Sequence, residues 1–241
     1  MCIRDSSYAG ALETLSQTDD KIVLVTHRSA QKTIPRQVEL GNSFDEMFRE
    51  RYLHLHVVAR RCRGGAQDTT QRSRSFLFAA LGQAVAKAFS ARRLSFFENG
   101  VISHNLPLGR QIVGTMATRT THPLSLRLLN NLCELALEGS VAIDNPYQWL
   151  TKTEVVRRIA ENGGRDRIMR AVSCTSIRQQ DSVRTHCGAC SQCLDRRFAI
   201  VAAGLDDHEA PEIYETDIFT GARGATMSKT MAVEWTRRMR S

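Results

Sequence analysis

Short apolar runs alternate along the chain with longer segments in which apolar positions recur at helical spacing. The short runs predict strands at residues 21–26, 53–58, 94–97 and 141–143. The periodic segments predict helices at residues 8–15, 36–49, 73–91 and 123–138, and another from 151 to a stop at 163–164. Because strands separated by helices pair in parallel, we predict an α/β fold with a doubly wound parallel sheet.

A sheet of this kind also predicts where ligands bind. In open parallel sheets, ligands lie beyond the carboxyl ends of the strands. Polar residues follow three of the predicted strands, at residues 26–29, 98–100 and 144–145. Loops after strands are often polar in any protein, so the agreement of the three loops indicates a site more strongly than each loop does alone.

Composition and charge argue against a nucleic-acid-binding protein, a membrane protein and a secreted protein. The chain has 241 residues, of which 33 are basic and 25 are acidic, and its formal net charge is +8. This charge is modest for the length, so we do not expect nucleic acid as a partner. No apolar run approaches the roughly 20 residues that a membrane-spanning helix needs, and the first residues lack a signal-peptide pattern. We expect a soluble, cytoplasmic protein with no membrane partner.

The first six residues do not resemble the start of a natural protein. Residues 1–6 look like the translation of a sequencing adapter joined to a running coding sequence, so we expect the natural N-terminus to be missing; the alternative is an ordinary disordered start. The rest of the chain is expected to form an α/β nucleotide-binding domain at 7–172, a zinc-binding segment with a helix at 173–205, and a C-terminal tail at 206–241.

Four of the seven cysteines fall close together: Cys174, Cys187, Cys190 and Cys193. Four thiolates satisfy tetrahedral zinc and leave no open position, which is typical of a structural site, and Gly188 supplies the turn between two of them. Two alternatives stay open, an iron–sulfur cluster with the same spacing and four unrelated buried thiols. His186 precedes the cluster and could be a substitute ligand, but we predict that it is a surface neighbour.

These residues resemble a known family. The segment Ser173-Cys174, followed by Cys187-Gly188-x-Cys190-x2-Cys193-x2-Arg196, is similar to the zinc segment of 7-cyano-7-deazaguanine synthases, enzymes of queuosine precursor synthesis. Two further segments agree in order and spacing, Arg72-x3-Phe76-Leu77 and Thr151-Lys152-x-Glu154-Val155-Val156. The resemblance extends from about Ser6 to Leu205, and the cysteine pattern is its most specific part.

The resemblance implies an ATP-pyrophosphatase fold with a phosphate-binding loop of the form Ser-Gly-Gly-x-Asp-Ser. Such enzymes adenylate 7-carboxy-7-deazaguanine with the help of magnesium, let ammonia displace AMP to give an amide, and repeat the cycle to give the nitrile. Asp5-Ser6-Ser7 stands where that loop should end, but no Ser-Gly-Gly precedes it. We therefore expect the first strand to be missing, the 241-residue chain to be inactive, and ATP with a small carboxylate or amine to be the partners. A homodimer stays open.

The expected nucleotide and substrate site collects residues from the strand ends and helix starts: Ser6, Thr26, His27, Arg72, Glu98 and Lys152. Arg72 and Lys152 near helix N-termini could bind phosphates, and Glu98 could bind magnesium or a substrate amine. His27 could contact nucleotide or substrate. For each of these side chains a simple surface or loop role is the alternative.

Two departures from the family affect the substrate. His27-Arg28-Ser29 replaces the usual Tyr-Gly-Gln, and the loop that starts at Glu98 lacks the family's substrate-side Asp and Cys. A divergent relative that acts on another substrate, as in anti-phage systems, is therefore one alternative. A zinc-stabilised, non-catalytic module that binds RNA or protein is another.

Overall fold

The computed structural model describes residues 4–28, 31, 34–59, 73–106, 120–176, 181–224 and 226–238. Its helices are α1 (Asp5–Gln17), α2 (Ile34–Met47), α3 (Arg74–Ala88), α4 (Gly100–Ser103), α5 (Pro123–Ala136), α6 (Lys152–Ile159), α7 (Ser191–Ala202) and α8 (Thr226–Arg238). The strands are β1 (Ile22–His27), β2 (Tyr52–Val57), β3 (Leu94–Ser95) and β4 (Ile143–Asp144). Every strand and helix predicted from the sequence overlaps one of these elements.

The strands form two separate parallel pairs. β1 pairs with β2 in a register that runs from Ile22 opposite Tyr52 to His27 opposite Val57. β3 pairs with β4, with Leu94 opposite Ile143. An α/β fold with parallel strands is thus present, but the single doubly wound sheet expected from the sequence is not confirmed, because β1 and β3 are not joined by a described ladder.

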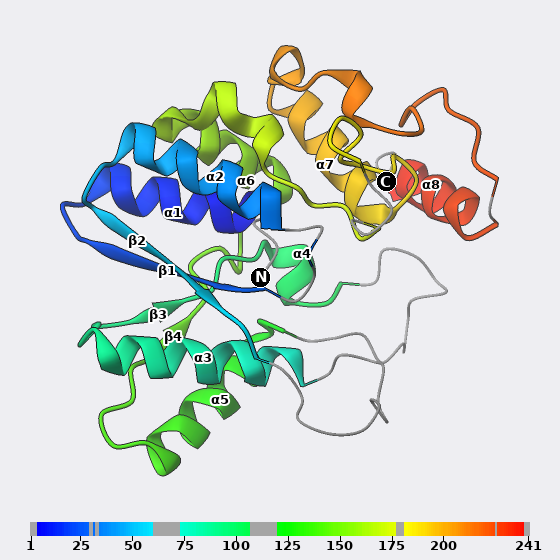
Figure 1. Ribbon diagram of the computed structural model, residues 1–241. Helices are drawn as coiled ribbons and strands as arrows, with labels where there is room; N and C mark the ends of the chain where they lie inside the picture. Colours follow the sequence, from blue (N-terminus) through cyan, green and yellow to red (C-terminus); the bar gives the residue numbers. More distant parts are fainter. Residues whose placement is uncertain are drawn as a thin grey trace.

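Helices cover both sides of the strands (Figure 1). α1, α2 and α6 lie on one side, where Tyr8, Leu12, Phe44 and Ile159 belong to the largest buried core. α3 and α5 lie on the other side and enclose a smaller core that includes Leu126. This layering is what buries both faces of a parallel sheet in α/β proteins.

A cavity of about 970 Å³ separates the two strand pairs. Its wall includes Val23 and Val25 of β1, Leu94 of β3, and Phe78 and Val85 of α3. The cavity therefore lies where β1 and β3 would need a further strand between them to form one continuous sheet. β1 is only half-buried along most of its length because it borders this space.

Local sequence signals set the boundaries of two helices that position the site. Thr151 and Glu154 form a reciprocal capping box at the start of α6, as their spacing predicts. His122 accepts a hydrogen bond from the backbone N–H of Leu124, and Pro123 occupies the first turn of α5. After α6 the chain continues through a π-helical turn, η3 (Ala160–Gly164), in which Gly163 has φ of 84°.

The C-terminal part packs around α7. Val172, Leu194, Tyr214 and Ile218 form a third buried core, with Trp235 of α8 packed against it. The Phe198 and Trp235 rings stack with centroids 5.2 Å apart. Among the described helices, none combines the length and apolar character that crossing a membrane requires.

Candidate functional site

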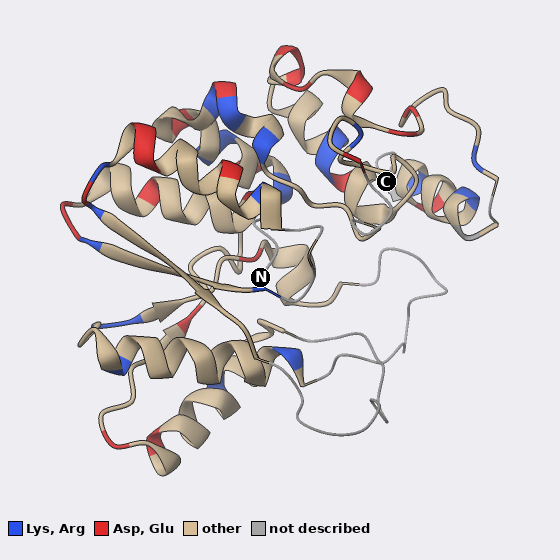
Figure 2. Cartoon of the chain, in the orientation of Figure 1, with Lys and Arg blue, Asp and Glu red and all other residues tan. Residues whose placement is uncertain are grey.

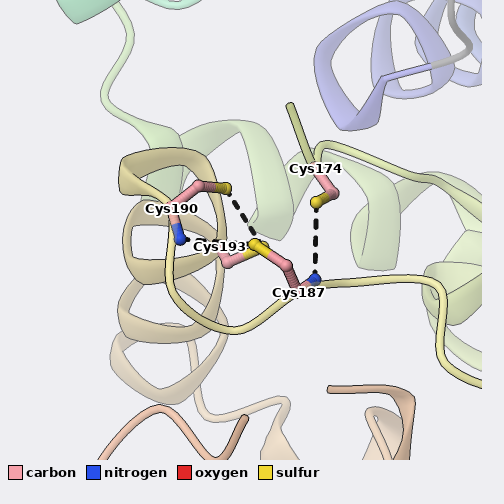
Figure 3. Close-up of side chains that lie close together, drawn as sticks. All are labelled: Cys174, Cys187, Cys190 and Cys193. Atoms are coloured by element: carbon pink, nitrogen blue, oxygen red, sulfur yellow. Dashed lines mark hydrogen bonds between the residues drawn. The ribbon is translucent and has the colours of Figure 1, made fainter. Parts of the chain in front are cut away.

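The four clustered cysteines come from two segments that meet at the start of α7 (Figure 3). Cys174 follows the 3-10 helix η4 (Arg165–Arg170), Cys190 is the N-cap residue of α7, and Cys193 lies in its first turn. The four sulfur atoms all lie within 4.8 Å of one another. The Cys190 and Cys193 sulfurs are 3.4 Å apart, and those of Cys187 and Cys193 are 3.9 Å apart. A tetrahedral ion with metal–sulfur bonds of about 2.3 Å would separate its ligands by about 3.8 Å, so the cluster could hold one metal ion.

Backbone groups around the cluster favour thiolates over thiols. The N–H groups of Ser176 and Cys187 donate to the Cys174 sulfur at 3.3 and 3.4 Å, and the Cys190 N–H donates to the Cys187 sulfur at 3.4 Å. Hydrogen bonds among the four sulfur atoms lower the pKa of Cys187 and Cys190 and raise the pKa of Cys174 and Cys193, so without a metal ion the cluster shares its protons unevenly. All four cysteines are free of disulfides. This chemistry fits a soft metal ligand set.

Gly188 makes the turn that brings the close cysteines together. Its φ is 71°, a conformation that favours glycine. A side chain at this position would also overlap the backbone carbonyl group of Thr216. The glycine is therefore required both by the turn and by the close approach of the second chain segment.

The structure corrects the prediction for His186. We expected a surface neighbour of the cluster, but His186 is fully buried. Its backbone bonds to Ile213 and Glu215, which draws the residue under the C-terminal segment. The ring contacts the Thr185 hydroxyl at 2.8 Å, and burial followed by the charge of Arg196 lowers the pKa of His186 to about 3. His186 is a packed, neutral histidine, and it is not among the clustered sulfur ligands.

A buried ionic network lies directly beside the cysteine cluster. Asp5, at the start of α1, is only 1% exposed, and its carboxylate forms an ion pair with Lys152 Nζ at 2.6 Å. The Ser173 hydroxyl, one residue before Cys174, donates to the same carboxylate at 2.7 Å. Arg196 forms an ion pair with its other oxygen. Helix α1, helix α6 and the metal-binding segment thus meet at one carboxylate.

Arg196 anchors this network from α7, three residues after the last clustered cysteine. Its guanidinium bonds to Glu209 at 2.6 Å and to the backbone carbonyls of Ala171 and Ile168 at 3.0 and 2.9 Å. The side chain is fully buried, and Tyr214 donates to Glu209 at 2.9 Å. Arg196 therefore ties the segment that carries the four cysteines to the rest of the fold.

The charges in the network determine the ionisation of Asp5. Burial by itself would raise the pKa of this carboxyl, but the nearby charges of Arg196 and Lys152 outweigh it and hold the pKa well below its usual range. Asp195, which is 7% exposed, has the opposite balance, and burial raises its pKa to about 6. Asp5 is consequently ionised at neutral pH and holds both cations in place.

Two of the predicted nucleotide residues lie at the carboxyl end of β1. Thr26 is buried, and its hydroxyl is hydrogen-bonded to His54 Nε2 at 2.8 Å. His27 Nε2 lies 3.3 Å from the Ala59 carbonyl, and its ring lies 6.1 Å from the Phe78 ring. Thr26 is thus engaged with the neighbouring strand, whereas His27 borders the cavity between the strand pairs.

Glu98 lies three residues after the end of β3, within a polar cluster. The Thr121 hydroxyl donates to its carboxylate at 2.8 Å. Asn145, just after β4, donates to the Glu98 backbone carbonyl at 2.9 Å and to the Ser103 hydroxyl at 2.7 Å. The carboxyl ends of β3 and β4 therefore carry a joined set of polar groups, as expected for a ligand site of a parallel sheet.

The other predicted nucleotide and substrate residues are Ser6, Lys152 and Arg72. Ser6 is buried in the first turn of α1, next to Asp5. Lys152 belongs to the Asp5 network. Arg72 lies outside the described residues. No described contact joins Thr26, Glu98 and Lys152 to one another. Lys152 lies beside the segment that carries the cysteines, whereas Thr26 and Glu98 belong to two separate groups of residues near the ends of β1 and β3.

Sequence reasoning did not select Asp5, Ser173 or Glu209 as site residues. Ser173 could have been noticed because it is part of the motif that includes Cys174. Asp5 lies in the stretch assigned to the adapter, although it also occupies the aspartate position of the family's phosphate loop. Glu209 carries no local signal, because only the fold places it against Arg196.

Comparison with known proteins adds one match. The family described as queuosine biosynthesis protein QueC matches residues 121–204, a stretch that includes Lys152 and all four clustered cysteines. No curated protein matches the chain. The family match and the geometry of the cysteine cluster fit the 7-cyano-7-deazaguanine synthases that the sequence motifs resemble, and this chain is QueC-like over residues 121–204.

Proposed function

We propose that this chain derives from an ATP-dependent ligase that activates a carboxylate by adenylation and transfers it to an amine or ammonia. The observation that carries the proposal is the QueC match over residues 121–204, within which the four cysteines converge as a metal-binding cluster. At family level the match supports an ATP-dependent synthase of the queuosine pathway. The reaction and the substrate are the parts that we propose.

The proposed chemistry has two steps. A carboxylate oxygen attacks the α-phosphorus of ATP, and pyrophosphate leaves with the electrons of the broken P–O bond. Ammonia then attacks the carboxyl carbon, AMP leaves with the former carboxylate oxygen, and the ammonium proton passes to solvent, which leaves an amide. Adenylation is needed because a free carboxylate is a poor acceptor for an amine, whereas AMP is a good leaving group.

We propose one zinc ion at Cys174, Cys187, Cys190 and Cys193. The separations of the sulfur atoms are compatible with one ion. Four thiolates leave no open position on a tetrahedral zinc ion, which supports a structural role. The zinc would hold the segment before α7 in place, and with it Ser173 and Arg196. Those two residues, together with Lys152, fix the Asp5 carboxylate at the start of α1.

We propose that ATP and magnesium bind beyond the carboxyl ends of the strands, near Thr26, His27 and Glu98. The support is the position of Thr26 and His27 at the end of β1, the position of Glu98 shortly after β3, and the polar cluster around Glu98. Arg72 would contribute a guanidinium to the phosphates. Lys152 would act on the start of α1 through Asp5, since their ion pair occupies the lysine in this arrangement.

We propose that the two strand pairs are halves of one sheet. The cavity of about 970 Å³ between β1 and β3 supports this, because a parallel strand placed there could pair with the open edge of each. None of the described residues supplies such a strand. The backbone loop at its end would be the phosphate-binding loop, and without it we expect the 241-residue chain to be inactive.

Release of AMP and pyrophosphate tests the proposal. The 241-residue chain and a version extended by upstream coding sequence would each be incubated with ATP, magnesium, ammonia and a panel of carboxylates that includes 7-carboxy-7-deazaguanine. The proposal predicts carboxylate-dependent AMP release by the extended chain and little by the shorter one. The absence of AMP release by both chains with every carboxylate would contradict it and favour a non-catalytic binding module.

A further inference from the structure

Helix α5 presents a stripe of leucines to solvent on the side opposite to its core contacts. Leu124, Leu128, Leu132 and Leu135 are all exposed, the last to 88%. At about 100° per residue they fall within a band of roughly 80° on the helix surface. Figure 2 shows few charged residues on α5 compared with α2 and α6. Four exposed leucines in one band form the kind of apolar surface that marks an interface.

The opposite side of α5 is fixed, so the stripe cannot turn inward. Leu126 and Cys133 are buried against α3 and β4. Asn130 bonds to both backbone groups of Ile143, donating to the carbonyl at 2.9 Å and accepting from the N–H at 2.7 Å. These bonds set the rotation of the helix and leave the leucines facing outward.

Two opposite charges flank the stripe on the same side. Arg127 and Glu134 are exposed, and neither forms an ion pair with a described residue. Seven residues separate them, which is about two helical turns, so they lie along one edge of the leucine band. They are also placed almost symmetrically about residue 130, at distances of three and four residues along the chain.

This symmetry is what an antiparallel helix pair requires. When two identical helices pack antiparallel about a twofold axis, each edge of one faces the same edge of the other. With the axis near residue 130, Leu128 would face the partner's Leu132, and Leu124 the partner's Leu135. Arg127 would then lie beside the partner's Glu134, and the twofold axis repeats the ion pair. A second copy of this chain therefore matches the surface in both shape and charge.

We propose that α5 forms a twofold, antiparallel interface between two copies of this chain. The leucine stripe supplies the apolar contact, and the Arg127–Glu134 pairs set the direction of the helices. The proposal does not depend on the catalytic proposal above, because no residue of the stripe belongs to the cysteine cluster or to the strand ends.

Charge reversal tests the interface on the 241-residue chain. Sedimentation equilibrium over a wide range of protein concentration is expected to show a monomer–dimer equilibrium for the unmodified chain. Arg127→Glu and Glu134→Arg should each weaken dimerisation by at least about tenfold, because each places like charges opposite one another twice. An equimolar mixture of the two variants should form heterodimers, and the double variant should dimerise again. Arg165→Glu, the same charge change away from α5, is the control and should dimerise normally.

Some outcomes would overturn the proposal. If the unmodified chain is monomeric at every concentration, a second copy does not occupy the leucine stripe. A membrane surface or another protein would then be the occupant, and the proposal would be wrong. Dimerisation that is unaffected by both single variants, or that is not restored by mixing them, would place the interface elsewhere. Circular dichroism of each variant establishes that it is folded.

Discussion

Asp5 and Arg196 form an ion pair between two almost fully buried side chains that are 191 positions apart in the chain. The pair joins the start of α1 to α7, and through α7 to the cysteine cluster. Lys152 completes the neutralisation of Asp5, while Glu209 balances Arg196 on the other side. The first helix of the chain is thus attached to its metal-binding segment by charge as well as by packing.

Removing the charge of Arg196 should destabilise the fold strongly. Arg196→Met leaves Asp5 and Glu209 buried with fewer positive partners, and breaking a buried pair typically costs about 3–5 kcal/mol of unfolding free energy. Arg237→Met removes an ion pair with Glu234 in which the arginine side chain is 70% exposed, and it should cost less than about 1 kcal/mol. Urea denaturation measures both values, and equal small losses would show that the network contributes little.

Metal binding should depend on Cys190 and not on Cys133. Cys190→Ser removes one of four ligands, so we expect loss of zinc and faster proteolysis of the C-terminal part, since the binding energy of a structural metal also stabilises the fold. Cys133 lies in the separate core between α3 and α5, and Cys133→Ser should retain about one zinc per chain. Elemental analysis together with limited proteolysis checks both. Iron with labile sulfide in the unmodified protein would instead identify an iron–sulfur cluster.

Glycines with the same backbone conformation should differ in their tolerance of alanine. Gly188 and Gly204 have φ of 71° and 68°, but only Gly188 has backbone atoms close to the position of a side chain. Gly204→Ala should cost about 1 kcal/mol through conformation alone. Gly188→Ala should cost more and should lower zinc affinity, because the Thr216 segment must move. If Gly188→Ala and Gly204→Ala lowered the thermal unfolding temperature and the zinc affinity by similar amounts, this account of the turn would be wrong.

His54 should make the fold sensitive to mild acid. Burial, followed by the charges of His56 and Arg28, lowers the pKa of His54 to about 4. A histidine in an unfolded chain titrates near 6.5, so the unfolded chain binds more protons between these values, and stability falls as the pH drops from about 6.5 to about 4. His54→Gln should reduce the stability loss between pH 7 and pH 5, by less than the roughly 2 kcal/mol that the full pKa shift would give, because the imidazole is partly exposed to solvent. Urea unfolding at both pH values measures the difference, and an unchanged loss would exclude His54 as its source.

Features set by neighbouring residues were predictable from the sequence, and features set by the fold were not. The capping box of Thr151 and Glu154 depends on a three-residue spacing, and the structure confirms it. The cysteine spacing likewise indicated convergence, which the sulfur positions confirm. The burial of His186 and the partners of Asp5 depend on segments far away in the chain, so no local pattern could show them. The division into two strand pairs was also missed, because apolar runs indicate strands without indicating which strands pair.

The origin of the oxygen in AMP tests the proposed carboxylate activation most directly. The extended chain would be given ATP, ammonia and a carboxylate labelled with ¹⁸O in both oxygens, and the AMP would be analysed by mass spectrometry. Adenylation followed by amine attack transfers one carboxylate oxygen to AMP, so we predict AMP that carries one ¹⁸O atom together with an amide that retains the other. AMP that carries no ¹⁸O, with the carboxylate unchanged, would show that water attacks ATP and would contradict the account.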